Sequence, residues 1–308
     1  SAEGDTLSGI EDVLGSAYAD RLTGNAGVNR LVGGAGDDTL VGLGGADALD
    51  GGAGFDTLDY SASNAGVTID FASGTGTGGD AQGDSFTGIE AVRGSALADR
   101  IVGDADAHTI FGQGGDDTFV AGTGAESIDG GSGLDAVDYS ASNAAVSVDL
   151  GTGAASGGYA SGDALTSIEA VVGTAHDDTL VGSAGVNVLS GGAGTDLIRG
   201  GAGSDILDGG SGTDTLDYST SSAGVSISLA AGTAVGGDAT GDAISNFENV
   251  VGSALADSLA GDAGVNVLTG GVGDDVLAGL GGADTLDGGT GFDVVDYSAS
   301  AAAVTVDI

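Results

Sequence analysis

A nine-residue repeat, Gly-Gly-x-Gly-x-Asp-x-apolar-x, runs through most of this chain of 308 residues and leaves few folds open to it. The segments GGAGDDTLV, GGAGFDTLD and GGAGSDILD show the pattern clearly. Twenty nonapeptides fall in four blocks, at residues 15–59, 94–138, 173–217 and 252–296, and all twenty carry a large apolar residue at the eighth position. A helix needs apolar residues every three or four positions, so this period instead predicts a Gly-rich turn followed by a three-residue strand.

A longer repeat of 79 residues organises the blocks. It is visible in the equal spacing of Tyr60, Tyr139, Tyr218 and Tyr297. Connectors at 60–93, 139–172 and 218–251 separate the blocks, and we expect them to continue the stack with strands near 67–71 and 89–93. The constant period predicts one continuous solenoid over residues 1–308. It leaves open whether the aspartate-bearing edge keeps its side from block to block.

Stacking is required because one nonapeptide cannot bury its own apolar side chain. Two nonapeptides form a flattened coil of 18 residues with a turn at each edge, and stacked coils form parallel strands about 4.8 Å apart. Glycine in the turns allows positive φ angles and close approach of neighbouring backbones. The predicted fold class is therefore all-β, a parallel β-roll or β-solenoid.

The composition excludes several functions. Forty-six acidic residues face five basic ones, which gives a formal net charge of −41. A polyanion does not bind nucleic acid phosphates. No run of apolar residues is long enough to insert into a membrane as a helix. The chain has no Cys, so disulfides, thiolate zinc sites and cysteine nucleophiles are excluded. With no catalytic motif in the sequence, we expect no enzyme activity in this chain.

The sixth position of each nonapeptide supplies the candidate metal ligands. In an 18-residue coil, the sixth residues of turns n and n+2 lie one above the other, and two stacked carboxylates repel unless a cation lies between them. Carboxylate and main-chain carbonyl oxygens together suit Ca²⁺. The odd turns carry Asp20, Asp38, Asp56, Asp99, Asp117, Asp135, Asp178, Asp196, Asp214, Asp257, Asp275 and Asp293. The even turns carry Asn29, Asp47, Glu126, Asn187, Asp205, Asn266 and Asp284, together with His108.

Pairing of these residues predicts the number of ions. The odd row offers two aspartate pairs per block and the even row one mixed pair, which predicts about 8 to 12 Ca²⁺ ions. The pair of His108 with Glu126 is the poorest, because the segment GDADAHTIF departs from the template. The connector acids, such as Glu90 and Asp84, are expected to make turn or loop contacts, with a ligand role as the alternative. The four tyrosines are expected to pack at a coil edge.

The nonapeptides resemble those of the RTX (repeats-in-toxin, hemolysin-type) family of type I-secreted bacterial proteins. That resemblance implies a calcium-filled β-roll, export from the cell and folding outside it. It predicts a structural module of a secreted or cell-surface protein, which we expect to serve as a spacer or surface-assembly segment. The alternative is a module of a secreted enzyme or toxin whose catalytic domain lies outside this chain. Calcium is the expected partner, and self-association or contact with other surface components is left open.

Overall fold

The computed structural model describes residues 7–307, and almost every regular element in this range is a short β-strand. Three 3₁₀ turns, η1 (Gly79–Ala81), η2 (Gly158–Ala160) and η3 (Gly237–Ala239), are the helical elements of the described part. The chain divides into two compact units. The first comprises residues 1–137 and 162–168, and the second comprises residues 138–161 and 169–308. No helix among the described residues has the length and apolar character needed to cross a membrane.

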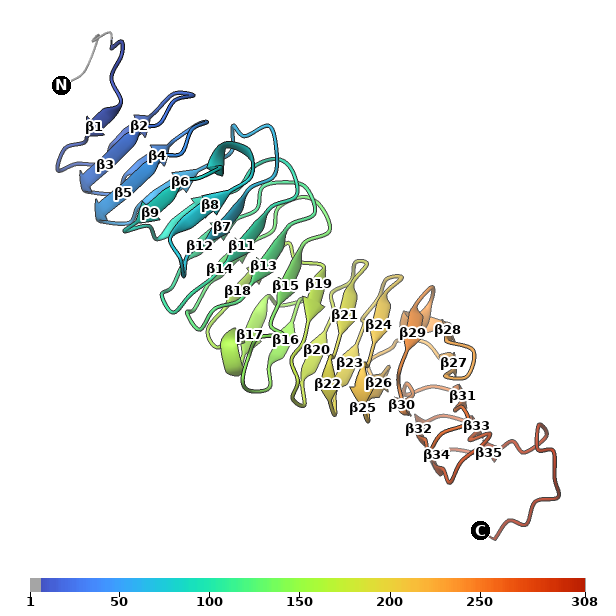
Figure 1. Ribbon diagram of the computed structural model, residues 1–308. Coiled ribbons are helices and arrows are strands. Elements are labelled where there is room, and N and C mark those ends of the chain that lie inside the picture. The colour runs from blue at the N-terminus through green and yellow to red at the C-terminus, as the bar shows by residue number, and fades with distance from the viewer. Residues whose placement is uncertain (1–6, 308) are drawn as a thin grey trace. The chain divides into compact units, whose positions relative to one another are not determined.

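The strands of the first unit belong to two facing sheets (Figure 1). One sheet contains β1 (Asp12–Leu14), β3 (Arg30–Ala35), β5 (Ala48–Ala53), β7 (Thr68–Asp70), β8 (Thr75–Thr77), β9 (Ser85–Thr87), β11 (Arg100–Val102) and β13 (Thr118–Val120). The other contains β2 (Arg21–Thr23), β4 (Thr39–Val41), β6 (Thr57–Asp59), β10 (Ala91–Arg93), β12 (Thr109–Phe111), β14 (Ser127–Asp129) and β18 (Ala164–Thr166). Strand β15 (Ala136–Asp138) ends one residue beyond this unit.

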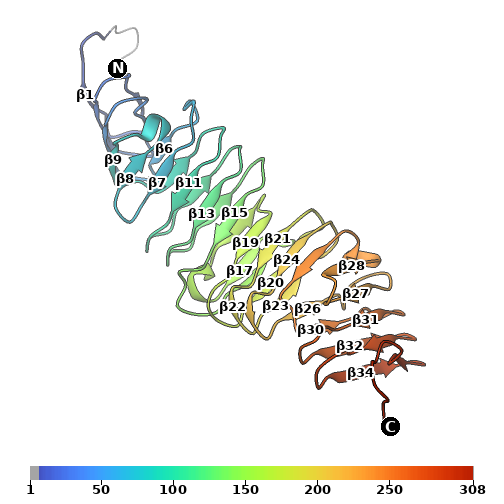
Figure 2. The same ribbon diagram turned by 45° about the vertical axis from the view of Figure 1, so that its right-hand side comes forward.

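The second unit repeats the arrangement (Figure 2). One sheet contains β19 (Ala170–Val172), β21 (Val188–Ser190), β24 (Ile206–Asp208), β27 (Ser226–Ser228), β28 (Thr233–Val235), β29 (Ala243–Ser245), β31 (Ser258–Ala260), β33 (Val276–Ala278) and β35 (Val294–Val295). The other contains β16 (Ser147–Asp149), β17 (Ala154–Ser156), β20 (Thr179–Val181), β23 (Leu197–Arg199), β26 (Thr215–Asp217), β30 (Asn249–Val251), β32 (Val267–Val272) and β34 (Thr285–Thr290). Strands β22 (Ala193–Gly194) and β25 (Ser211–Gly212) pair across two turns.

The register confirms the 18-residue coil. Strand β2 pairs in parallel with β4, so that Leu22 lies opposite Leu40, and β4 pairs in the same way with β6, which places Leu58 next. The middle residue of each strand points inward and forms the core, as with Leu31, which is fully buried. In the outermost coils, which have a neighbouring coil on one side, Leu22 is half-buried and Val295 is 43% exposed. The predicted all-β parallel roll is therefore confirmed.

The connectors insert an antiparallel segment that the nine-residue template does not contain. In the first unit, β7 and β8 pair antiparallel, β8 pairs antiparallel with β9, and β9 then pairs in parallel with β5. On the opposite sheet, β10 pairs directly with both β6 and β12. Strands β7 and β10 agree with the strands expected near 67–71 and 89–93. The second unit has the same antiparallel pairing between β27 and β28.

This insertion moves the aspartate-rich row to the other edge. In the first unit, the strands β2, β4 and β6 of the odd nonapeptides of block one are continued by β10 and then by β12 and β14, which belong to even nonapeptides of block two. In the second unit, β26 continues through β30 to β32 in the same way. Within each unit, therefore, the aspartate-bearing edge does not keep its side from block to block. The row of odd nonapeptides moves to the opposite edge at the connector.

The glycines of each turn are required for two different reasons, backbone conformation and space. In the nonapeptide that starts at Gly33, Gly34 has φ +113° and Gly36 has φ +108°, which side chains with a Cβ rarely adopt. Gly33 itself does not have a positive φ. A Cβ there would lie 2.2 Å from Asp38 Oδ2 and 2.5 Å from the carbonyl oxygen of Gly51, so this first glycine is required for space.

Candidate metal centre

The sixth residues form a ladder along the edge of the coils. The backbone N–H of Asp38 donates to Oδ1 of Asp56, one coil further, at 2.7 Å, and the N–H of Asp20 donates to Oδ1 of Asp38 at 2.8 Å. The N–H of Asp196 donates to Oδ1 of Asp214 in the second unit, at 2.8 Å. Each carboxylate is thus fixed by the preceding coil through one oxygen. The vertical alignment expected from the repeat is present.

The second oxygen of most ladder carboxylates is buried and accepts no hydrogen bond. This holds for the Oδ2 atoms of Asp38, Asp47, Asp56, Asp117, Asp196, Asp205, Asp214 and Asp275. Their side chains are at most 1% exposed. A buried, ionised carboxylate without a partner is costly. Burial, as the largest cause, raises the pKa of Asp117 to about 7, that of Asp205 to about 7 and that of Asp196 to about 6.

Main-chain carbonyl oxygens face five of these eight unpaired carboxylate oxygens, those of Asp38, Asp56, Asp117, Asp196 and Asp214. A Cβ built on Gly112 would lie 2.2 Å from Asp117 Oδ2 and 2.5 Å from the carbonyl oxygen of Gly130. A Cβ on Gly191 would meet Asp196 Oδ2 at 2.3 Å and the carbonyl oxygen of Gly209 at 2.6 Å. We call this space, between the first glycine of a turn, its aspartate Oδ2 and the carbonyl one coil further, the turn cradle.

The turn cradle fits a hard divalent cation. It brings together acceptor-only oxygens from a carboxylate and a carbonyl, which are the donors that Ca²⁺ prefers. Among the described residues, no three Asp, Glu, His or Cys side chains converge to form a metal site by themselves. An ion in the ladder would therefore depend on main-chain carbonyl oxygens for part of its coordination. When bound, it would neutralise the buried carboxylates.

The first aspartate of each block is held differently. Both oxygens of Asp99 already accept hydrogen bonds, Oδ2 from the Ser95 N–H at 2.6 Å and Oδ1 from the Val67 N–H at 2.7 Å. Asp178 and Asp257 repeat this arrangement with Thr174 and Ser253. The sequence carries a signal for it, because these blocks begin Gly-Ser or Gly-Thr in place of Gly-Gly. A local hydrogen-bonding role thus accompanies any ligand role of Asp20, Asp99, Asp178 and Asp257.

The asparagines of the even row are also hydrogen-bonded at both ends of the amide. The Oδ1 atom of Asn187 accepts from the Ser183 N–H at 2.7 Å, and its Nδ2 donates to the carbonyl oxygen of Glu169 at 3.2 Å. Asn29 and Asn266 make the same contacts with their neighbours. A donor N–H₂ that bridges two coils stabilises the stack without a cation.

The carboxylates of Asp135, Asp284 and Asp293 occupy the equivalent ladder positions of their own turns.

Connector acids extend both rows of sixth-position residues, a place that the sequence predicts for them only as the alternative to turn or loop contacts. The N–H of Asp47 donates to Asp84 Oδ1 at 2.8 Å, and the hydroxyl of Tyr60 donates to Asp84 Oδ2 at 2.9 Å. In the second unit, Asp242 likewise accepts from the Asp205 N–H and the Tyr218 hydroxyl. Tyr60 and Tyr218 are buried, which agrees with the expectation that they pack at a coil edge. Their hydroxyl groups also donate a specific hydrogen bond there.

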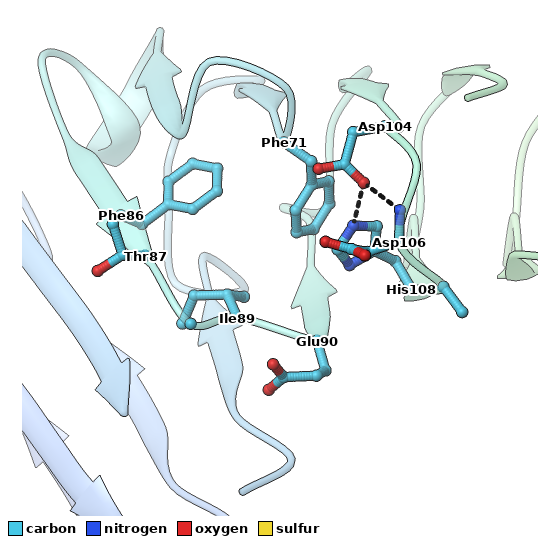
Figure 3. Close-up of a pocket in the computed structure, with 10 residues that line it drawn as sticks. Phe71, Phe86, Thr87, Ile89, Glu90, Asp104, Asp106 and His108 are labelled. Atoms are coloured by element: carbon cyan, nitrogen blue, oxygen red, sulfur yellow. Dashed lines mark hydrogen bonds and ion pairs between the residues drawn. The ribbon is translucent and has the colours of Figure 1, made fainter. Parts of the chain in front are cut away.

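His108 marks the irregular turn of block two (Figure 3). Its Nε2 lies 2.9 Å from Asp104 Oδ1, and its ring stacks on Phe71 with centroids 3.8 Å apart. These residues line a cavity of about 460 Å³ that also includes Asp106 and Glu90. Burial and Asp163 raise the pKa of Glu126 to about 9, in that order of size. The pair expected to be poorest thus combines an imidazole with a carboxyl group that resists ionisation.

No arginine neutralises the ladder in the described part of the chain. The ion pairs that Arg21 and Arg199 form go to Asp59 and Asp217, which lie on strands and outside the sixth position. Hydrogen bonds from Ser61 and Arg21 hold the pKa of Asp59 below its usual range despite its burial. Residues 7–307 therefore supply no arginine to the buried carboxylates of the ladder.

The comparison with known families agrees with this geometry. The RTX calcium-binding nonapeptide repeat (4 copies) matches residues 5–34, 23–58, 93–125, 111–143, 172–207, 181–216 and 251–295. These segments cover nearly all of the four nonapeptide blocks and more than half of the chain. No curated protein matches the chain. The family's repeats are structural elements that bind calcium. The chain belongs to the RTX calcium-binding nonapeptide repeat family.

Proposed function

We propose that this chain is a calcium-dependent structural module of a secreted protein, which folds when Ca²⁺ binds outside the cell. The observation that carries the proposal is the ladder of buried, acceptor-only oxygens, such as Asp38 Oδ2 and Asp117 Oδ2, which face carbonyl oxygens. A cation removes the cost of burying these charges. The proposed ligands are the sixth residues of the nonapeptides, and about 8 to 12 ions would neutralise roughly 16 to 24 negative charges.

Binding and folding are coupled because the cradles exist only in stacked coils. Without Ca²⁺, self-repulsion at a net charge of −41 expands the chain. Extracellular calcium modules bind at about 10⁻⁴–10⁻³ M. At such affinity the chain stays unfolded in the cytosol, which suits export through a type I system, and folds once calcium is plentiful.

Within that function we propose the role of a spacer or surface-assembly segment. The support is the 79-residue period, which is constant over the chain because each tyrosine from Tyr60 to Tyr297 follows the last at the same distance. A module that only accompanied a catalytic domain would not need a constant length. Electron microscopy of the calcium-loaded protein should show uniform rods or ordered lattices. Compact particles of irregular size would contradict this role.

A calcium titration followed by far-ultraviolet circular dichroism tests the coupled mechanism. We expect one cooperative gain of β signal with a midpoint at about 10⁻⁴–10⁻³ M Ca²⁺. Mg²⁺ at the same concentration should not replace it, since Mg²⁺ requires a tighter octahedron and retains its waters. A chain that is already folded at submicromolar Ca²⁺ would contradict folding after export.

A further inference from the structure

The glutamate near the end of two connectors, 60–93 and 218–251, occupies the next rung of the aspartate ladder. In the first unit, the N–H of Asp56 donates to Glu90 Oε2 at 2.8 Å, just as the N–H of Asp38 donates to Asp56 Oδ1 at 2.7 Å. In the second unit, the N–H of Asp214 donates to Glu248 Oε2 at 2.8 Å. The two junctions are separate examples of one arrangement. The row therefore does not stop at the last nonapeptide.

The backbone before each glutamate also reproduces the turn cradle. A Cβ on Gly51 would lie 2.0 Å from the carbonyl oxygen of Gly88 and 2.7 Å from Asp56 Oδ2. In the second unit, a Cβ on Gly209 would lie 2.1 Å from the carbonyl oxygen of Asn246 and 3.0 Å from Asp214 Oδ2. Gly88 and Asn246 both have a positive φ, +62° and +56°, which turns this carbonyl toward the ladder. A connector segment without the nonapeptide pattern thus supplies the same donor.

An unpaired buried oxygen points into each junction. The side chains of Asp56 and Asp214 are 0% exposed, and the Oδ2 atom of each accepts no hydrogen bond. No arginine or other donor approaches these atoms in the described residues. Two acceptors therefore face each other across each junction, and a bound cation would satisfy both.

We propose that each of these junctions binds a further calcium ion outside the nonapeptide pairs. Asp56 Oδ2, the Gly88 carbonyl and the Glu90 carboxylate would hold one ion. Asp214 Oδ2, the Asn246 carbonyl and the Glu248 carboxylate would hold the other. This inference rests on the proposed calcium function and extends it, because it makes the connectors part of the ion row. The ions would join each nonapeptide block to the connector that follows it.

The other edge of the same connectors lacks the facing carbonyl oxygen. A Cβ on Gly42 would lie 2.4 Å from Asp47 Oδ2, and one on Gly200 would lie 2.5 Å from Asp205 Oδ2, but neither has a carbonyl oxygen among its three nearest atoms. There the Tyr60 hydroxyl donates to Asp84 Oδ2, and the Tyr218 hydroxyl donates to Asp242 Oδ2 at 2.7 Å. A hydroxyl donor satisfies the connector carboxylate directly. Glu90 has no such hydroxyl donor, and its carboxylate points away from Asp104 and His108 (Figure 3). The assignment is therefore limited to the glutamate junctions.

The test compares ion counts between the wild type and a double variant, Glu90→Gln with Glu248→Gln. Glutamine keeps an oxygen that accepts the hydrogen bond from the Asp56 or Asp214 N–H, so the main effect is loss of charge. The matched control is Glu11→Gln, because Glu11 has the same place in the 79-residue repeat, and its carboxylate accepts no hydrogen bond from a ladder aspartate among residues 7–307. Bound Ca²⁺ is measured by equilibrium dialysis and elemental analysis, after circular dichroism has shown a wild-type fold.

We expect the double variant to bind two ions fewer per chain than the wild type and the control to lose none. An unchanged count and an unchanged affinity in the folded double variant would overturn the inference. Should the double variant fail to fold, each single variant is measured, with one ion fewer expected and no loss as the contrary result. A wild type that binds no Ca²⁺ would instead refute the proposed function, so the two failures are distinguishable.

Discussion

Filling one turn cradle with a methyl group should remove one bound calcium ion. Gly33→Ala is suited to this test because Gly33 does not have a positive φ, so the substitution introduces no backbone strain. The new Cβ would lie 2.2 Å from Asp38 Oδ2 and 2.5 Å from the Gly51 carbonyl oxygen. Real Cβ atoms do not approach so closely, so one of these oxygens must move out of the cradle.

The expected cost has two parts. Overpacking of this kind costs about 1–3 kcal/mol whether or not calcium is bound. Loss of one ion with a dissociation constant of about 10⁻⁴–10⁻³ M costs a further ~1.4–2.7 kcal/mol at about 10 mM Ca²⁺. The second part grows with calcium concentration and the first does not. The calcium dependence therefore separates ion loss from simple crowding.

The assay is calorimetric ion counting together with thermal unfolding at several calcium concentrations. Gly185→Ala is the control, since Gly185 also does not have a positive φ and its Cβ would meet nothing closer than Ser183 Oγ at 3.6 Å. We expect one ion fewer in Gly33→Ala and no change in the control. If both variants bind as many ions as the wild type and differ by a calcium-independent amount, the cradle is not an ion site.

Two further outcomes follow from the same geometry. Asp38→Ala should lose more bound Ca²⁺ than Asp20→Ala, because Asp38 lies between two ladder neighbours. Asp20 has one such neighbour within its block, and its carboxylate already accepts a hydrogen bond from the Ser16 N–H. Equal losses of Ca²⁺ by calorimetry would contradict pairing between turns n and n+2. In excess chelator the chain should be more folded at pH 5 than at pH 7.5. Burial raises the pKa of Asp117 and Asp205 from 3.8 to about 7, so the native state binds protons that the unfolded state releases, and their stabilisation is full below about pH 4 and lost as the pH rises through 7. Circular dichroism that shows less structure at pH 5 would refute this sign.

The coil and its core could be predicted from sequence because each is determined locally. Leu40 and Leu58 recur at one position of a fixed period, and the register places them opposite each other as the period requires. The aspartate ladder follows from the same spacing. The antiparallel strand β8 could not be predicted, since its sequence Thr-Gly-Thr lacks an apolar pattern and its pairing with β7 depends on the path of the whole connector.

The connector acids show where the period stops being informative. Glu90 lies 34 residues after Asp56, a spacing that no nonapeptide template covers, yet the fold places it one rung away. Tyr60 reaches Asp84 for a similar reason. By contrast, the hydrogen bonds from Ser95 to Asp99 could have been found, because serine replaces the second glycine of that turn. Repeat arithmetic predicts the rows, and the chain path between blocks decides how they continue.

The most direct measurement is circular dichroism of the whole chain at pH 7.5, first in excess chelator and then after Ca²⁺ is restored. With the buried Oδ2 atoms of Asp56 and Asp214 uncompensated, we expect the β signal to be lost in chelator and fully recovered with millimolar Ca²⁺. An unchanged β signal in chelator would show that the ladder tolerates its charges without a cation, and would contradict the account.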